Sequence, residues 1–324
     1  MSDDNVLDAF DGEILDLVIP DSLAGYRVDR ALALLTGFSR SEAHHAIDEG
    51  LVKINDHVVR KSSQSLDVGD HLSAVLPLSD EGEVAPDATV VFDVVLDDPD
   101  FVVINKPAGL VVHPGAGQRE GTLVAGLVAA YPEMAQLAVD GYCDALRPGI
   151  VHRLDKGTSG LLVAAKTPRA FLSLSDQLAE RTMQRTYLGL VEGYVEEERG
   201  VVDAPIGRST RTPTLMAVRA DGRPARTSYE VLRRIEKPHN VSLLRLRLDT
   251  GRTHQIRVHL GTIGHPVVND NRYGHRRDRR LLEGRFFLHS TTLRFVHPVT
   301  GDIVDANAPL PQDLQALVPD FKDD

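Results

Sequence analysis

Residues 147–163 read RPGIVHRLDKGTSGLLV, and this segment is the most informative in the chain. A short apolar stretch leads into a turn crowded with histidine, arginine, aspartate, threonine and serine, and a run rich in Leu and Val follows. Two strands joined by such a turn display its polar groups at the edge of a sheet. Asp155 is therefore a candidate reacting carboxylate, with the alternative that Asp155 and Arg153 only brace a tight turn.

Three further motifs flank this segment in order along the chain. They are NKPAGLVVHP at 105–114, RTY at 185–187 and TGRTHQIRVH at 250–259. With His-Arg-Leu-Asp at 152–155 they resemble the signature of pseudouridine synthases of the large-subunit ribosomal RNA type, and the resemblance covers about residues 26 to 298. It implies that Asp155 is the catalytic residue of an isomerase that converts uridine to pseudouridine.

The resemblance also implies roles for Tyr187 and Arg257. An ionised carboxylate can attack C6 of the base or the anomeric carbon, or it can remove a sugar proton. Asp155 must stay ionised inside a pocket, and a guanidinium neighbour lowers a carboxylate pKa by ~1–3 units. We expect Arg257 to be that neighbour, on a strand whose polar face also carries Gln255 and His259. Tyr187 is expected to lie against the uracil ring and to help remove the C5 proton.

Further substrate contacts are expected around these three residues. Leu288 resembles the apolar pocket wall of the family, and Arg153 is a candidate wedge that fills the place of a flipped base. The remaining expected substrate-binding residues are His152, Arg252 and Gln255. The sequence departs from the family at Gly157, where an acidic residue is common, and at Asn269, where glycine is usual. Both departures are expected to affect loop geometry only.

The segment from Tyr26 to about residue 80 reads as a small module. Val28–Leu35 has helical composition, Ser39 and Glu42 form a capping-box pattern for a second helix, and Gly50 suits its left-handed end. A hairpin is expected from strands at 51–54 and 58–59 joined by the turn residues Asn55 and Asp56, with a last strand near 71–76. These residues resemble the S4 RNA-binding domain. Its expected RNA contacts are Arg40, Lys53, Arg60 and Lys61.

The expected organisation has four parts. Residues 1–25 are an acidic segment, 26–80 the S4-like domain, 81–89 a linker, and 90–324 the catalytic domain. Strands are expected at 101–105, 184–195, 228–235 and 241–249, with helices at 121–131 and from a Thr167 cap with Pro168 at the first position. Irregularly mixed helices and strands favour an α+β fold. The family resemblance implies a mixed, mostly antiparallel sheet in the catalytic domain.

The net charge of −11 argues at first against a nucleic-acid partner. Its distribution reverses this argument, because acidic residues gather in the first twenty positions and between 80 and 100. Arginines gather in two clusters, which are Arg208, Arg211, Arg219, Arg223, Arg226, Arg233 and Arg234, and Arg272, Arg276, Arg277, Arg279, Arg280 and Arg285. A solvated face is one interpretation, and a phosphate-binding surface is the one we favour.

Several other classes of site do not fit the sequence. Gly160–Thr167 nearly matches a phosphate-binding P-loop, but Ala165 replaces the second glycine. Histidine spacing suggests no metal site, and the single cysteine, Cys143, allows no intramolecular disulfide. No apolar run approaches the ~20 residues of a membrane span, and the acidic start differs from a signal peptide. We expect a cytoplasmic monomer without metal, nucleotide or other cofactor.

The sequence thus predicts an enzyme that isomerises uridine in structured RNA, most specifically 23S ribosomal RNA of the large-subunit precursor. Two alternatives come from other classes. The first is an RNA-binding protein that has the fold without turnover, against which intact Asp155, Tyr187 and Arg257 argue. The second is a phosphoryl-transfer enzyme that uses the segment 160–167.

Overall fold

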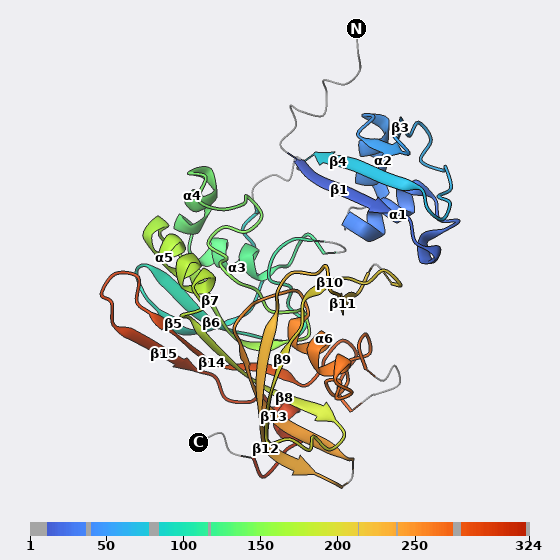
Figure 1. The fold of residues 1–324 in the computed structure, drawn as a ribbon. Helices are drawn as coiled ribbons and strands as arrows, with labels where there is room; N and C mark the ends of the chain where they lie inside the picture. The colour runs from blue at the N-terminus through green and yellow to red at the C-terminus, as the bar shows by residue number, and fades with distance from the viewer. Residues whose placement is uncertain are drawn as a thin grey trace. The chain divides into compact units, whose positions relative to one another are not determined.

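The computed structural model describes residues 12–36, 40–77, 84–115, 118–212, 214–237, 239–274 and 280–321. Within these residues the chain forms two compact units, with the main boundary near residue 82 (Figure 1). Each unit has an apolar core of its own.

The first unit is built on an antiparallel sheet with the strand order β1-β4-β2-β3. Its elements are β1 (Gly12–Val18), a 3-10 helix (Asp21–Leu23), α1 (Val28–Thr36), α2 (Arg40–Asp48), β2 (Val52–Ile54), β3 (His57–Val58) and β4 (His71–Pro77). Leu32, Ile47 and Leu72 from the two helices and β4 are fully buried together. The helices therefore cover one face of the sheet.

Local signals explain most of this unit. Gly50 adopts φ 74° after α2, and Asn55 and Asp56 turn the β2–β3 hairpin at φ 50° and 65°. These positions confirm the predicted helix end and hairpin turn, whereas the predicted cap Ser39 lies outside the described residues. The strand β1 falls in the segment 1–25, for which the sequence predicts only acidic character, and it pairs with β4 along its whole length.

The second unit contains, among its described residues, a nine-stranded mixed sheet with the order β5-β6-β7-β14-β8-β13-β12-β9, where β15 also pairs with β14. Its strands are β5 (Asp93–Asp97), β6 (Phe101–Lys106), β7 (Ser159–Ala165), β8 (Gln184–Glu192), β9 (Arg199–Asp203), β12 (Arg226–Ile235), β13 (Val241–Leu248), β14 (Leu288–Val296) and β15 (Ile303–Asn307). Only β7 and β14 run parallel within this sheet of described residues. This is the predicted α+β architecture. A small separate sheet joins β10 (Ile206–Arg208) to β11 (Met216–Val218).

Helices cover both faces of the sheet around β7, whose residues are all buried. Leu162 packs with α3 (Leu123–Ala130) on one face, and Val163 packs with α5 (Pro168–Ala179) on the other. Burial on both faces explains why β7 reads as a continuous apolar run. The remaining helices are α4 (Glu133–Val139), α6 (Gln255–Thr262) and α7 (Gln312–Gln315).

The predicted strands at 101–105, 184–195, 228–235 and 241–249 correspond to β6, β8, β12 and β13, and the helix at 121–131 corresponds to α3. Thr167 caps α5 as predicted, since its side chain accepts a hydrogen bond from the Ala170 amide. Part of the expected linker is packed, because Val84 is buried in the main core and Asp87 N donates to the Ala125 carbonyl. In the described part of the chain, none of the helices combines the length and the apolar character needed to cross a bilayer.

Candidate functional site

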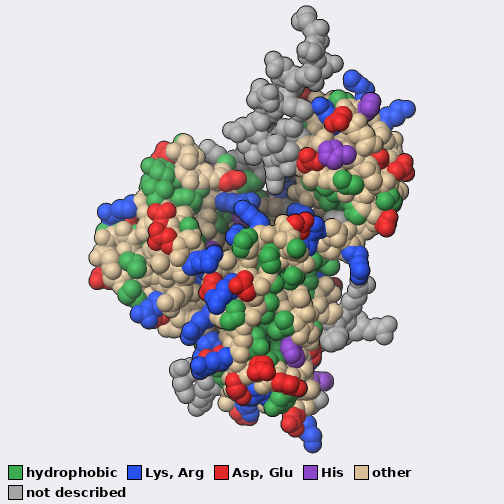
Figure 2. All heavy atoms as spheres, in the orientation of Figure 1, with side chains coloured by type: hydrophobic (Ala, Val, Ile, Leu, Met, Phe, Trp, Pro, Cys, Tyr) green, Lys and Arg blue, Asp and Glu red, His purple; other side chains and the backbone are tan. Residues whose placement is uncertain are grey.

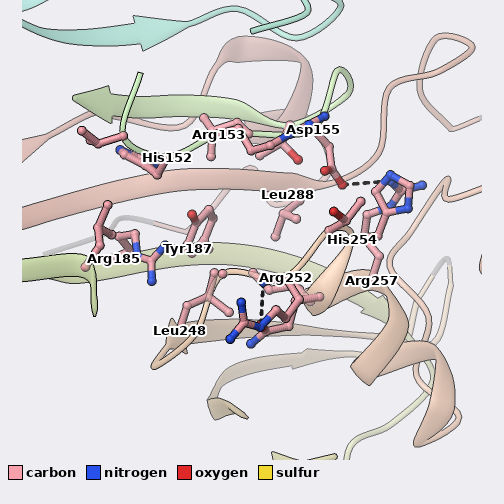
Figure 3. A pocket seen from close by; sticks show the side chains of 18 of the residues that line it. His152, Arg153, Asp155, Arg185, Tyr187, Leu248, Arg252, His254, Arg257 and Leu288 are labelled. Atoms are coloured by element: carbon pink, nitrogen blue, oxygen red, sulfur yellow. Dashed lines mark hydrogen bonds and ion pairs between the residues drawn. The ribbon is translucent and has the colours of Figure 1, made fainter. Parts of the chain in front are cut away.

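A pocket of about 340 Å³ opens at the ends of three adjacent strands of the second unit (Figure 3). The turn before β7 contributes Asp155, β8 contributes Tyr187, and the first residue of β14 contributes Leu288. The segment 248–254 and α6 form the opposite wall. The volume lies at the small end of the ~300–1,000 Å³ range of ligand pockets, which suits one nucleoside.

Asp155 lies in this pocket beside Arg257, as the sequence predicts. The Arg257 Nη1 atom donates to Asp155 Oδ2 at 2.9 Å, and the two side chains are 5% and 17% exposed respectively. Arg257 also binds Asp270 with two hydrogen bonds, at 2.6 Å from Nε and 3.0 Å from Nη2. The guanidinium therefore joins two carboxylates, and only Asp155 lines the pocket.

The electrostatics keep Asp155 ionised. Burial raises its pKa, but His254, Arg257 and Arg153 outweigh burial, so the pKa is held below the ordinary value. Burial also disfavours the charged form of Arg257, yet Asp270 and Asp155 together raise its pKa. The Arg257 guanidinium additionally lies 4.3 Å from the Phe286 ring centroid. An ionised carboxylate with a fixed cationic partner is the result.

The element that carries Arg257 differs from the prediction. Gln255 to His259 belong to the helix α6, so the predicted strand is wrong. All residues from Gln255 to Leu260 are buried, and a helix buried on all sides has no polar stripe that reveals its period. His254 precedes the helix at φ 55°, and its Nδ1 lies 2.6 Å from the Tyr273 hydroxyl. Burial lowers the pKa of His254 to about 4, so it is neutral at pH 7.

Asp270 was not among the predicted site residues. Asn269 adopts φ 65° just before it, a conformation that asparagine tolerates better than most residues and that glycine adopts freely. The Asn269 amide donates to the Arg285 carbonyl at 2.5 Å. The departure at 269 thus preserves the turn that places Asp270 on Arg257. The departure therefore concerns loop geometry, as expected, although a single guanidinium separates the neighbouring Asp270 from Asp155.

Tyr187 and Leu288 form the apolar middle of the pocket. Both side chains are buried, and burial raises the pKa of the Tyr187 phenol. Ser290 stands opposite Tyr187 in the β8–β14 ladder, and Leu288 begins β14. A flat ring and a branched aliphatic chain on neighbouring strands provide surfaces for a planar base.

Three of the four remaining predicted substrate contacts, Arg153, Arg252 and Gln255, have different surroundings. Arg153 is exposed at the pocket, where its Nη1 lies 3.1 Å from His113 Nε2. Arg252 is half-buried and donates to the Pro224 carbonyl. Gln255 is 3% exposed, accepts from Thr250 and Arg252, and donates to Arg226 O and Thr227 Oγ1. These bonds use both amide protons and both lone pairs of Gln255, so its amide braces the wall of the pocket.

His152 and Arg185 lie on the same side of Tyr187, away from Asp155 (Figure 3). The His152 Nε2 atom accepts from the Val163 amide at 3.1 Å, and burial lowers the pKa of His152 to about 3, helped by the charge of Arg185. Arg185 shares a face of β8 with Tyr187, two residues on. His152 was a predicted site residue, whereas Arg185 belongs to the RTY motif and had no predicted role.

Buried cations brace the turn that holds Asp155. Lys106 is fully buried at the end of β6, and its Nζ donates to the carbonyls of Pro107 and Leu110 and, at 3.4 Å, to the carbonyl of Lys156 in the turn. Burial lowers the pKa of Lys106 to about 7. Arg285 donates to the Gly157 carbonyl at 2.8 Å and to Ser159 Oγ at 3.0 Å. A side chain at 157 would collide with the Gly284 carbonyl, which explains glycine where the family often has an acidic residue.

Several arginines of the two clusters are ion-paired within the protein, and the interpretation of the clusters as a phosphate-binding surface stays a prediction. Arg219 pairs with Asp221, Arg226 with Asp249, and Arg234 with Glu198. The second cluster contains Arg280, paired with Glu192, and the buried Arg285, while Arg276, Arg277 and Arg279 lie outside the described residues. On the face of the second unit that Figure 2 shows, basic and acidic side chains are interspersed.

Three other predictions concern the RNA contacts of the S4-like unit, the segment 160–167 and metal binding. Arg60 and Lys61 are exposed and Lys53 is half-buried, while the Arg40 side chain lies outside the described residues. The segment 160–167 contains β7, whose backbone pairs with β6 and β14 and does not form a phosphate-binding loop. Within the described ranges, no cluster of three or more metal-binding side chains occurs.

Comparisons with known proteins agree with this geometry. The family model described as RNA pseudouridylate synthase matches residues 100–262, and the S4 domain model matches 27–72. Ribosomal large subunit pseudouridine synthase D of Nitrosomonas europaea is 42% identical over 94% of this chain and 87% of its own. An uncharacterized RNA pseudouridine synthase of Chloroflexus aurantiacus is 43% identical over 100% of this chain and 98% of its own.

Two solved structures are also similar to this chain. Human RNA pseudouridylate synthase domain containing 1 has a TM-score of 0.56 and 29% identity, covering 71% of this chain and 89% of its own. Human RNA pseudouridylate synthase domain containing 4 shares the fold, with a TM-score of 0.50 and 23% identity over 68% of this chain and 90% of its own.

Proposed function

Because this chain belongs to the RNA pseudouridylate synthase family, we infer that it isomerises uridine to pseudouridine in RNA, and we propose that Asp155 is the nucleophile. The observation that carries this proposal is the ion pair of Asp155 with Arg257 at the wall of a nucleoside-sized pocket. The lowered pKa of Asp155 supports the role, since only the ionised carboxylate can attack or remove a proton.

The proposed reaction begins with a uridine flipped into the pocket, its ring against Tyr187 and Leu288. Asp155 bonds to the ring or to the anomeric carbon, or takes a sugar proton, and the bond from N1 to the sugar breaks. The base turns, C5 joins the same sugar carbon, and the carboxylate is released or, where it had taken a sugar proton, returns that proton to the sugar. Tyr187 assists loss of the C5 proton while N1 gains one, so the product is an isomer of the substrate and the cycle consumes no co-reactant.

We propose large-subunit ribosomal RNA, and more specifically 23S RNA, as the substrate. The names of several relatives, among them those of Nitrosomonas europaea and Haemophilus ducreyi, support this choice. The S4 domain match supports an RNA partner. We further propose that the protein acts as a monomer, in the cytoplasm, without a cofactor.

Mapping pseudouridine across ribosomal and transfer RNA in cells with and without this protein tests the proposal. We expect specific sites in 23S RNA to lose the modification when the protein is absent and to regain it with the wild-type chain. Unchanged pseudouridine in ribosomal RNA together with lost pseudouridine in transfer RNA would make transfer RNA the substrate class. Unchanged modification everywhere, with RNA binding retained, would instead support the alternative of an RNA-binding protein without turnover.

We propose that the S4-like unit supplies phosphate contacts through Lys53, Arg60 and Lys61. Replacing all three by glutamine is expected to weaken binding of a structured RNA and to flatten the dependence of log Kd on log salt, by about 0.7 to 0.9 for each phosphate that is no longer neutralised. Filter binding over a salt series measures this slope. Lys237→Gln, an exposed lysine of the second unit, is the control. An unchanged slope in the triple variant would remove this unit from the RNA contacts.

A further inference from the structure

Two hydrogen-bond donors in the pocket wall lack partners in the described protein. They are Nε of Arg185 and Nδ1 of His152, and both atoms are buried. Arg185 is 7% exposed and His152 is 9% exposed, so more than nine-tenths of each side chain is withdrawn from water. Both residues line the pocket that contains Asp155.

The chemical character of the two donors follows from their surroundings. His152 accepts from the Val163 amide at Nε2, so its neutral ring must carry the proton on Nδ1. It presents an uncharged N–H. Arg185 presents a guanidinium whose buried Nε has no hydrogen-bond partner, and leaving a buried polar atom unpaired is energetically costly. A ligand that supplies the missing partner would explain why the fold keeps this group in the pocket wall.

We propose that Arg185 and His152 form a subsite for a carbonyl oxygen of the uracil, where Arg185 stabilises the negative charge of the departing base. This inference rests on the proposed function. When the bond from N1 to the sugar breaks, its electron pair stays on the base and spreads over N1 and the carbonyl oxygens. Donors fixed where charge develops stabilise the transition state most effectively in a site that excludes water.

The surroundings favour the base over an RNA phosphate. Arg185 shares its strand face with Tyr187, which is proposed to lie against the ring, and its charge acts on both the Tyr187 phenol and the His152 ring. A neutral imidazole N–H suits a carbonyl oxygen. The more exposed arginines of the pocket, Arg153 and Arg252, are better placed for phosphates.

The first test removes the charge of Arg185. On a short stem-loop RNA that the wild-type chain modifies, Arg185→Met is expected to slow single-turnover pseudouridine formation by about 10²- to 10³-fold, and Arg185→Lys less. The thermal midpoint of the free Met variant should equal or exceed that of the wild type, since the unsatisfied buried Nε is gone. Arg294→Met, an exposed arginine of β14, is the matched control. A normal rate, or a lower thermal midpoint that accounts for the lost rate, would overturn the assignment.

A second test distinguishes a contact of Arg185 with the base from a contact with an RNA phosphate. Fluorine at C5 withdraws electrons and makes uracil a better leaving group, so a 5-fluorouridine substrate needs less help from Arg185. The ratio of wild-type to Arg185→Met rates for cleavage of the bond from N1 to the sugar should therefore fall on this substrate. An equal ratio on both substrates, with a flatter salt dependence of binding, would assign Arg185 to a phosphate and overturn the proposal.

Two substitutions of His152 distinguish substrate binding through Nδ1 from a purely structural role of the ring. Asparagine can keep a donor near Nδ1 and loses the acceptor for Val163, whereas glutamine can keep the acceptor and loses that donor. If Nδ1 binds the substrate, His152→Asn should react faster than His152→Gln at equal RNA affinity. The reverse order would make His152 purely structural. In all these tests, a wild-type chain that forms no pseudouridine would count against the proposed function itself.

Discussion

Asp155→Asn is expected to lower single-turnover pseudouridine formation by on the order of 10⁴-fold or more, the scale found when an essential catalytic group is removed. The amide has the shape of the carboxylate but cannot act as nucleophile or base. Arg257 keeps its two hydrogen bonds to Asp270, so its charge stays paired and the wall of the pocket should remain in place. The measurement is direct quantification of pseudouridine in a stem-loop substrate.

Binding and stability should be nearly unchanged in this variant. The affinity for RNA and the thermal midpoint provide the controls, together with Asp176→Asn at an exposed carboxylate of α5. Turnover above a trace by purified Asp155→Asn would show that another group attacks the substrate. Loss of RNA binding in parallel with turnover would mean that the carboxylate holds the RNA and has no chemical role.

Arg257→Met is expected to damage both the rate and the fold. Asp270 is 1% exposed, and leaving a buried carboxylate without its partner typically costs about 3–5 kcal/mol. The double variant Arg257→Met, Asp270→Asn removes the stranded charge, and the amide oxygen that it introduces at position 270 can still accept from the backbone amides of Arg272 and Tyr273. We expect the double variant to recover much of the stability and little of the activity.

The pH dependence of the rate separates the effect of Arg257 on the pKa of Asp155 from its effect on the stability of the fold. In the wild type the pKa of Asp155 is lowered, so the carboxylate stays ionised well into the acid range. Without the guanidinium the pKa rises by about 1 to 3 units, and activity is lost at a correspondingly higher pH as the solution is acidified. The acid limb of the pH–rate profile should thus move upward in the double variant. A wild-type profile, or a normal rate at neutral pH, would contradict the role given to Arg257.

Much of the second unit could be predicted because local signals agree with its packing. The cap at Thr167 and Pro168 fixes the start of α5, and the apolar run of β6 ends at Lys106-Pro107. The pairing of Asp155 with Arg257 was also predictable, since a pocket carboxylate requires a cation and the family resemblance indicates which arginine supplies it. These features depend on neighbours in sequence or on one strong electrostatic need.

The features that could not be predicted depend on tertiary contacts, which no local sequence pattern indicates. The segment 255–260 alternates in polarity like a strand, yet it forms a helix that is buried on all sides. Asp270 joins Arg257 through a turn at Asn269 that is recognisable only in three dimensions. Arg185 had the RTY motif and the alternating spacing of a strand as its signals, but its lack of a partner at Nε emerges only from the packed pocket.

The strands that hold the site are internal to the sheet, since β14 lies between β7 and β8. Backbone amides of such core strands exchange with solvent only through openings close to global unfolding. The enzyme then behaves as a rigid template, and the largest rearrangement before chemistry falls on the RNA. Extruding a base costs a few kcal/mol, and less when it is already unstacked. Selection among uridines is therefore governed in part by the opening equilibrium of the RNA itself, before any contact with the pocket is made.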